Sequence, residues 1–305
     1  NFNTQLWLNN YREWSKQRST GENYAVVCYL SQYGFCDRLS QAIAHGIGKA
    51  NAQVQLVDLI ASDTQELSAL ISEASAVVVP TWPIKSDSEL QSNIGTLLAS
   101  LKQKQWVATY DSYGGNEEPI DFITNQLRKL GQKEAFKPLR VRDEPNKSVY
   151  QQFEEAGTDL GQILTRKKNL AATKSLDGDL NKALGCLSGG LYIVTAKDNE
   201  GADSRDGAMV ASWVSQASFE PPGITVAVAK DRAIESLLQV NDRFVLNILQ
   251  ENNYLHLFRH FLKRFPPGAN RFEGVELMND LAAGGPVLSD ALAFLSCKVI
   301  QRMET

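Results

Sequence analysis

The feature that most constrains the fold is an alternation of short β-branched runs with amphipathic segments over residues 23–164. Runs such as Val77-Val78-Val79 are typical of strands buried on both faces, with helices covering the sheet. The pattern predicts an α/β domain with a doubly wound parallel sheet of five strands. The expected strands are 24–30, 53–59, 76–80, 105–111 and 135–141. The expected helices are 37–49, 64–72, 88–102, 118–130 and 147–164.

The first strand leads into a loop, residues 31–36, that suits an anion. The loop contains Gly34, and Leu39 and Ile47 follow at the spacing of a buried helical stripe. Such a turn points backbone N–H groups and the positive end of the helix dipole into one pocket. We expect Asp37 to cap the helix. The loop lacks both the P-loop and the three-glycine dinucleotide motif, so an ordinary βα turn is an equal alternative.

Two further strand ends carry an aromatic residue beside small or turn-forming residues. Trp82 follows the third strand and Tyr113 follows the fourth. Stacking of each on a flat ring adds roughly 0.5–1.5 kcal/mol, and Gly114 and Gly115 let the backbone approach closely. Each aromatic alone is more simply a half-buried surface ring, but the three loops together indicate a ligand site. The candidate residues are Ser31, Gln32, Tyr33, Gly34, Phe35, Cys36, Thr81, Trp82, Pro83, Ile84, Asp111, Ser112, Tyr113, Gly114 and Gly115.

From Asp177 the pattern changes to short β runs separated by explicit turns, which favours a mostly antiparallel barrel. The expected strands are 191–196, 208–219, 224–229, 244–249 and 294–300, and the expected helices are 180–187, 233–239 and 254–261. We predict four segments: an arm or linker at 1–21, the first domain at 22–165, a solvated linker at 166–176, and the barrel at 177–305.

Composition excludes several classes of function. A net charge of −4 does not favour a nucleic-acid partner or an anionic membrane surface. No apolar run approaches the ~20 residues of a membrane span, and the N-terminus has no signal core, so we expect a cytoplasmic protein. The four cysteines are scattered, and Cys28 and Cys297 read as reduced core thiols. His256 and His260 lack a third ligand, so no metal site is expected, and no catalytic residue is assigned.

The first domain resembles a flavodoxin-like domain. The pattern Ser31-x-Tyr33-Gly34-x-x-Asp37-Arg38-Leu39 is similar to that of flavodiiron proteins. The resemblance implies FMN, with its phosphate on the loop 31–36 and its ring between Trp82 and Tyr113. Cys36 stands where the family usually carries a hydroxyl. Because a thiol is a weak donor, the resemblance implies a lowered phosphate affinity.

The second domain resembles the flavin reductase family, which has a split-barrel fold, in residues 187–195, 208–222 and 226–232. The resemblance implies FMN or FAD, a segment at 266–272 that closes over the site with Phe261, and a barrel that is C-terminally incomplete. By the same resemblance, the flavin ring is lined by Ala211, Ser212, Trp213, Val214 and Ser215, and the flavin phosphate is held by Lys230, Asp231 and Arg232.

Together the two domains are similar to the C-terminal part of the diflavin flavodiiron proteins of oxygenic phototrophs. The diiron domain of that family should carry an iron cluster bound by His, Asp and Glu residues, and the three histidines of this sequence cannot supply one. The resemblance implies an oxidoreductase that passes electrons from NAD(P)H through a reductase flavin to FMN. In the intact protein they would continue to a diiron site that reduces O₂ to water. It also implies a homo- or heterodimer with a related flavodiiron chain. Two alternatives are a weakly flavinated or apo module for assembly with a sister chain, and a free-standing NAD(P)H:flavin reductase.

Overall fold

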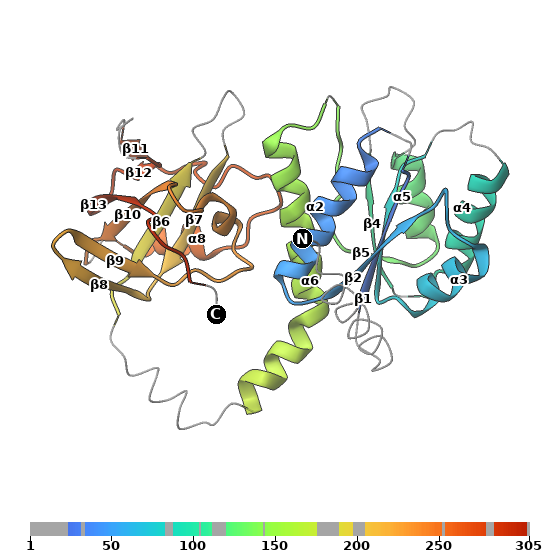
Figure 1. Ribbon diagram of the computed structural model, residues 1–305, viewed down its shortest axis with the longest axis horizontal. Coiled ribbons are helices and arrows are strands. Elements are labelled where there is room, and N and C mark those ends of the chain that lie inside the picture. Colours follow the sequence, from blue (N-terminus) through green and yellow to red (C-terminus); the bar gives the residue numbers. More distant parts are fainter. Residues whose placement is uncertain are drawn as a thin grey trace, which may run out of the picture. The chain divides into compact units, whose positions relative to one another are not determined.

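The computed structural model describes residues 24–31, 34–82, 88–103, 105–111, 120–142, 144–175, 189–197, 205–251, 254–278 and 284–303. The chain divides into two compact units, whose elements are labelled in Figure 1. Unit 1 comprises Asn1–Asp143 and Asp159–Lys167, and unit 2 comprises Glu144–Thr158 and Lys168–Thr305. The domain boundaries expected from the sequence remain a prediction.

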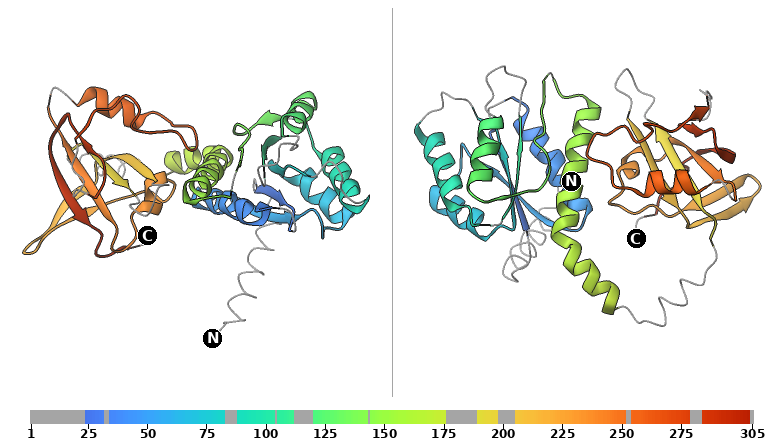
Figure 2. Two further views of the ribbon diagram at one scale, coloured as in Figure 1. Left: turned by 90° about the horizontal axis from the view of Figure 1, so that it is seen from above. Right: turned by 180° about the vertical axis from the view of Figure 1, so that it is seen from behind.

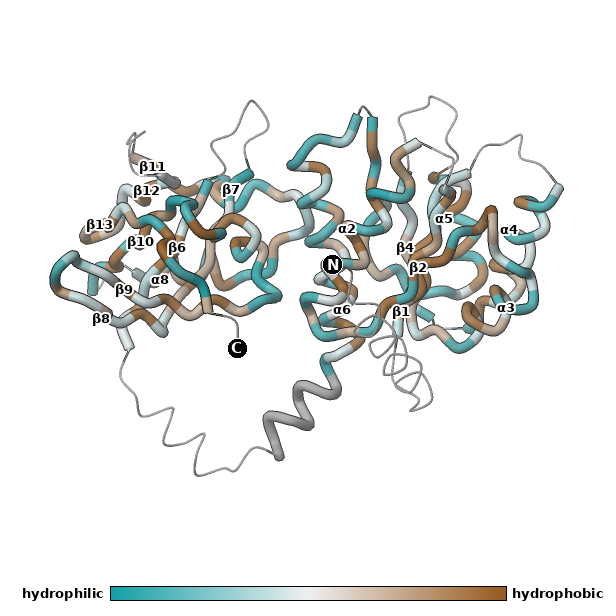
Figure 3. Tube along the Cα trace, in the orientation of Figure 1, coloured by the Kyte–Doolittle hydropathy of each residue, from teal (hydrophilic) through white to brown (hydrophobic). Residues whose placement is uncertain are grey.

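Unit 1 is built on a five-stranded parallel sheet, as the sequence predicts. The order is β2-β1-β3-β4-β5, which is the flavodoxin-like order. The strands are β1 (Tyr24–Tyr29), β2 (Gln53–Asp58), β3 (Ala76–Pro80), β4 (Trp106–Tyr110) and β5 (Lys133–Glu134). All five residues of β3 are buried, because β3 lies inside the sheet with helices on both faces. In Figure 3 the hydrophobic residues follow these central strands.

Helices cover both faces of this sheet. Figures 1 and 2 show α2 and the unit 1 part of α6, Asp159–Lys167, on one face, with α3, α4 and α5 on the other. Their bounds are α2 (Cys36–Lys49), α3 (Thr64–Glu73), α4 (Ser88–Ser100), α5 (Ile120–Lys129) and α6 (Lys147–Ser175). Asp63 caps α3, since its carboxylate accepts hydrogen bonds from the N–H groups of Gln65 (2.9 Å) and Glu66 (3.1 Å).

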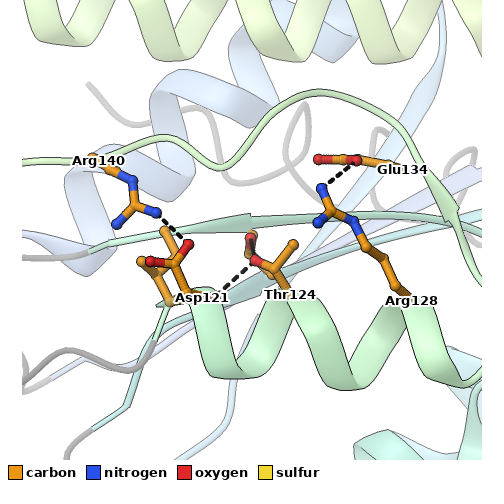
Figure 4. Close-up of polar contacts among 7 residues, drawn as sticks. Asp121, Thr124, Arg128, Glu134 and Arg140 are labelled. Carbon is orange, nitrogen blue, oxygen red and sulfur yellow. Dashed lines mark hydrogen bonds and ion pairs between the residues drawn. The ribbon is translucent and has the colours of Figure 1, made fainter.

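The fifth strand departs from the sequence prediction of 135–141. Regular pairing with β4 ends at Glu134, and the ladder resumes only as an isolated bridge between Tyr110 and Leu139. Pro138 lies in the gap, and proline has no N–H for the ladder. The segment is also tied to α5 by the ion pairs Arg128–Glu134 and Arg140–Asp121 (Figure 4). These pairs are exposed and therefore contribute little to stability.

Helix α6 is longer than the sequence indicated. The sequence predicts a helix over 147–164, whereas α6 continues to Ser175, through most of the segment 166–176 that the sequence indicates as a linker. The basic stretch contains neither proline nor glycine before that point, and Lys, Arg, Leu and Ala are favourable helix residues. Among the described helices, α6 included, none combines the length and the hydropathy that crossing a bilayer requires.

Unit 2 is mostly antiparallel. One sheet has the order β13-β10-β6-β7, and β8–β9 and β11–β12 form separate two-stranded sheets. The described strands therefore form no closed ring, which agrees with the expected split barrel. The elements are β6 (Tyr192–Lys197), β7 (Asp206–Ala211), β8 (Val214–Phe219), β9 (Pro222–Val226), the 3₁₀ helix η1 (Ala233–Leu237), β10 (Arg243–Leu249), α8 (Leu255–Leu262), β11 (Leu277–Met278), β12 (Val287–Leu288) and β13 (Ala291–Lys298).

Several predictions for this half need correction. The strand expected at 224–229 is β9, at Pro222–Val226. The single run 208–219 is two strands, because the chain leaves the four-stranded sheet at Ser212 and Trp213. The last strand is 291–298 rather than 294–300. Cys297 is only half-buried, whereas Cys28 in unit 1 is fully buried. The helix expected at 180–187 lies outside the described residues.

Alternate residues of β6 face two separate cores. Val194 packs with Ile234 and Leu246 in a cluster around η1. Ile193 packs with Leu257 and Phe272 in a second cluster beneath α8. This alternation is the period of two that a strand imposes on its side chains.

A buried ion pair anchors the segment 266–272, which the sequence suggested as a cover. Glu155 in the unit 2 part of α6 lies 2.9 Å from the Arg271 guanidinium, and both side chains are about nine-tenths buried. Glu155 also accepts hydrogen bonds from Gly268 N (3.1 Å) and Gln151 Nε2 (3.1 Å). Because both charges are paired and hydrogen-bonded, removing either partner would leave a costly buried charge.

Candidate functional site

The candidate site in unit 1 lies where the winding of the sheet reverses. β1 pairs with β2 on one side and β3 on the other, and all three strands are parallel. Their carboxyl ends therefore share one edge, and the loops after β1 and β3 leave in opposite directions. This is the position at which doubly wound sheets bind ligands. The fourth strand end joins them, since Thr81 N donates a hydrogen bond to Tyr110 O (2.8 Å).

The described residues of the loop after β1, namely Ser31, Gly34 and Phe35, fit an anion site. Gly34 has φ of +54°, a left-handed conformation that favours glycine. Ser31 and Gly34 are exposed, Phe35 is half-buried, and α2 begins directly after them. The start of the loop is held by a hydrogen bond from Ser31 N to Asp58 Oδ1 (3.3 Å). The first-turn amides and the dipole of this 14-residue helix thus suit a phosphate.

The cap of this helix differs from the prediction. The residue before α2 is Phe35, which makes no side-chain capping hydrogen bond, and Asp37 lies within the first turn. Asp37 therefore acts through its charge, which is favourable near the positive end of the helix dipole.

The thiol of Cys36 is turned into the core. Its side chain is fully buried, and Sγ accepts a hydrogen bond from Leu30 N (3.1 Å) and lies 3.1 Å from Tyr110 Oη. Burial raises the pKa of Cys36 to about 12. The hydrogen-bonding capacity of this thiol is thus used inside the sheet. This corrects the view that its weakness as a donor would act directly on a phosphate.

The other described candidates directly follow the ends of β3 and β4. Thr81 and Asp111 are buried, Trp82 is half-buried, and Asp111 N donates a hydrogen bond to Leu139 O (2.9 Å). The remaining candidates lie outside the described residues, namely Gln32, Tyr33, Pro83, Ile84, Ser112, Tyr113, Gly114 and Gly115.

A separate hollow on unit 1 lies between α5 and β4. Val107, Thr109, Thr124 and Phe136 are among its lining residues. Thr124 Oγ1 lies 2.8 Å from Thr109 Oγ1 and donates to Ile120 O (2.7 Å), so these hydroxyls are engaged with the protein (Figure 4). All its lining residues differ from the candidates at the strand ends.

In unit 2 the chain that leads to the predicted phosphate-binding segment 230–232 passes beside the predicted ring-lining segment 211–215. Ala227 N donates a hydrogen bond to Trp213 O (3.0 Å), which places the start of the segment leading to Lys230 beside the segment 211–215. Ala211 is buried, Val214 is half-buried, and Ser212, Trp213 and Ser215 are exposed. Lys230 and Arg232 are also exposed, and Asp231 is half-buried.

Gly189 is a residue whose role the sequence reasoning missed. A Cβ on Gly189 would lie 2.5 Å from Ser212 O, so glycine allows the backbone to pass directly against the candidate flavin-lining segment. The Gly189-Gly190 pair lies in the range 187–195 that resembles the flavin reductase family, and it is assigned no role of its own from the sequence. The pair itself was a signal for close backbone approach.

The two histidines of α8 have separate partners. His256 Nε2 lies 2.9 Å from Asp290 Oδ2, and His260 Nε2 lies 2.7 Å from Arg271 O. His260 also packs edge-on against Phe261. Across the ranges that the structure describes, no three His, Cys, Asp or Glu residues are grouped as metal ligands.

Comparison with known proteins gives the family. The flavin reductase like domain family matches residues 184–305. Diflavin flavoprotein A 1 of Synechocystis sp. is 54% identical over 297 residues, which are 97% of this chain and 51% of that protein. The chain thus spans about half the length of this relative.

Two solved structures are also similar. The crystal structure of a flavodoxin-like domain from Synechococcus sp. is 46% identical and covers 47% of this chain and 99% of its own, with a TM-score of 0.45. The crystal structure of a diflavin flavoprotein A3 from Nostoc sp. is 40% identical and covers 49% of this chain and 98% of its own, with a TM-score of 0.46. On these sequence identities, the chain belongs to the diflavin flavoprotein family.

Proposed function

We propose that this chain passes electrons from NAD(P)H, through an FMN or FAD in unit 2, to an FMN held at the strand ends of unit 1. In the intact protein the electrons would continue to a diiron site that reduces O₂ to water. The observation that carries the proposal is the left-handed Gly34 loop at the switch point of a flavodoxin-like sheet, in a chain whose second part matches the flavin reductase like family.

The protein residues have binding and orienting roles in this proposal. The 31–36 loop and the start of α2 would hold the FMN phosphate, and Trp82 and Tyr113 would flank the ring. In unit 2, 211–215 would line the ring and 230–232 would hold the phosphate. The flavins supply the hydride and electron chemistry, so an acid–base pair is not required.

The test is anaerobic reduction of the flavin-loaded full chain by NADH and by NADPH, followed by flavin absorbance. The proposal expects two flavins per chain, both bleached by one of the two nucleotides. In Gly34→Val, which removes the unit 1 site, only one flavin should remain to be bleached. A wild type that holds and bleaches a single flavin would instead support the free-standing reductase.

The assembly module remains a second candidate because unit 2 exposes large apolar side chains. Trp213 is 60% exposed, Phe219 84% and Leu292 64%. Exposed apolar groups of this kind favour a protein partner, here a second related chain. This candidate expects a colourless protein that is dimeric in light scattering. Phe219→Ser would lower the dimer fraction without changing the flavin content.

A further inference from the structure

We propose that Cys36 and Tyr110 are positioning residues that hold the two ends of the loop after β1, at Leu30 and Cys36, in place for an anion and link them to the end of β4. The inference rests on the proposed FMN site in unit 1. It concerns the part of that site that selects the phosphate.

A continuous chain of hydrogen bonds runs beneath the loop. Leu30 N donates to Cys36 Sγ (3.1 Å), Sγ lies 3.1 Å from Tyr110 Oη, and Oη donates to Cys28 O (2.9 Å). The pattern is self-consistent when the thiol donates its proton to Oη, because each N–H, S–H and O–H then donates once. The side chains of Cys36 and Tyr110 are both fully buried.

This chain closes the loop at its base. Leu30 is the residue before the loop and Cys36 is the first residue of α2, so the bond between them fixes the separation of the loop ends. The direction of the first-turn amides depends on that separation. Tyr110 comes from β4, two strands away from β1, and its backbone carbonyl also accepts the hydrogen bond from Thr81 N. The phosphate loop and the loop after β3 therefore share Tyr110 as a common support.

The properties of the Cys36 thiol suit a supporting role better than a reactive one. Burial raises its pKa to about 12, so the thiolate is not formed at neutral pH. The thiolate is the form that reacts with oxidants and alkylating agents. Neutral Cys36 also keeps the S–H that the hydrogen-bond chain needs, which the thiolate would lack.

A support for the phosphate loop makes a specific prediction about flavin selectivity. FMN carries a phosphate and riboflavin does not, whereas both carry the same ring. Loss of the support should weaken the binding of FMN and leave the binding of riboflavin almost unchanged. A general loss of packing would weaken both ligands by the same factor.

The experiment is calorimetric titration of the full-length chain with FMN and with riboflavin. The unit 1 site is identified as the one that Gly34→Val weakens. The test variants are Cys36→Ala and Tyr110→Phe, and Cys36→Ser restores a donor and acceptor at the same position. Tyr24→Phe is the matched control, because Tyr24 Oη donates to Leu70 O (3.0 Å) at the opposite end of β1.

We expect Cys36→Ala and Tyr110→Phe each to weaken FMN about tenfold and riboflavin less than about twofold. The double variant should be little worse than either single, since both act through one network. Cys36→Ser and Tyr24→Phe should keep the wild-type preference for FMN. A readout without flavin is alkylation of Cys36 followed by mass spectrometry, which should be faster in Tyr110→Phe than in Tyr24→Phe.

Two results would overturn the inference. In the first, the wild type binds FMN in unit 1, but Cys36→Ala and Tyr110→Phe either weaken FMN and riboflavin equally or keep the wild-type preference for FMN. This result refutes the supporting role of the two residues and leaves the proposed function standing. A wild type that binds no FMN in unit 1 refutes the support and the proposed function together.

Discussion

At the scale of single residues, Asn247 shows how unit 2 satisfies a polar group in its core. Asn247 is fully buried on β10. Its Nδ2 donates to Ile193 O and Thr195 Oγ1 (both 3.1 Å), and its Oδ1 accepts from Leu288 N (2.9 Å). One amide thus ties β10 to β6 and to β12.

Asn247→Ala should lower the free energy of unfolding by about 2 kcal/mol or more, because it leaves the buried Leu288 N–H without its acceptor. Urea unfolding of the full chain, followed by circular dichroism, measures the change. Asn270→Ala is the control, since Asn270 is exposed and its Oδ1 accepts a hydrogen bond from Phe272 N. The control should lose less than about 1 kcal/mol. Equal losses would contradict this account.

The buried thiol of Cys28 makes stability depend on alkaline pH. Burial raises the pKa of Cys28 above its ordinary value of 9.0, so the folded chain keeps a proton that the unfolded chain releases. The stabilisation is complete below about pH 9 and is lost as pH rises, by about 1.4 kcal/mol per pH unit. In Cys28→Ala the slope of the unfolding free energy against pH should be smaller by the contribution of about one proton, as measured by urea unfolding from about pH 9 to about pH 11. An unchanged slope would refute the assignment.

The left-handed conformation of Gly34 is open to prediction from the sequence, whereas the orientation of Cys36 is not, and the reason is physical. A lone glycine between a strand and a helix indicates a backbone conformation that only local sequence determines. The orientation of Cys36 depends on Tyr110, which is 74 positions away in the chain. Local spacing placed Cys36 at the end of the loop, before a helix expected at 37–49, and carried no information about that partner.

At the scale of elements, periodicity found the strands and helices of unit 1 but not all their ends. β3 was predicted at its observed bounds because its residues are uniformly apolar and buried. The fifth strand was wrong because the apolar residues after Glu134 face the core without regular pairing, and Pro138 breaks the ladder. The separate strands β7 and β8 were merged because the chain changes sheets without a glycine or proline to mark the break.

The close contact of α2 with α6 gives a test at this scale. A Cβ on Gly161 would lie 2.8 Å from both Ala50 Cβ and Ile47 O. Gly161→Ala should therefore destabilise unit 1 by about 1–3 kcal/mol, although alanine favours helices. Gly95→Ala on α4 is the matched control, because a Cβ there meets nothing within 4 Å. Thermal unfolding should show Gly95→Ala stabilised by up to about 1 kcal/mol, and a stabilised Gly161→Ala would contradict the packing.

At the scale of the whole molecule, the order of elements was the part most open to prediction. Alternating strands and helices lead to a parallel sheet, and short antiparallel strands to a barrel-like unit. The separation of β8–β9 from the four-stranded sheet was not predictable, because it depends on pairings between distant residues. The exposed Phe219 and Leu292 likewise became evident only in the fold, since an apolar residue in a strand sequence is normally assigned to the core.

The central claim is that the strand ends of unit 1 bind a flavin phosphate through the Gly34 loop. The most direct measurement is the number of FMN molecules bound per chain at saturation, for wild type, Gly34→Val and the control Gly48→Ala. A β-branched residue cannot take the φ of Gly34 without strain, whereas Gly48 has open space around its Cβ position. The account predicts that Gly34→Val binds one FMN per chain fewer than wild type and Gly48→Ala at the same FMN concentration. Equal numbers for Gly34→Val and wild type would contradict it.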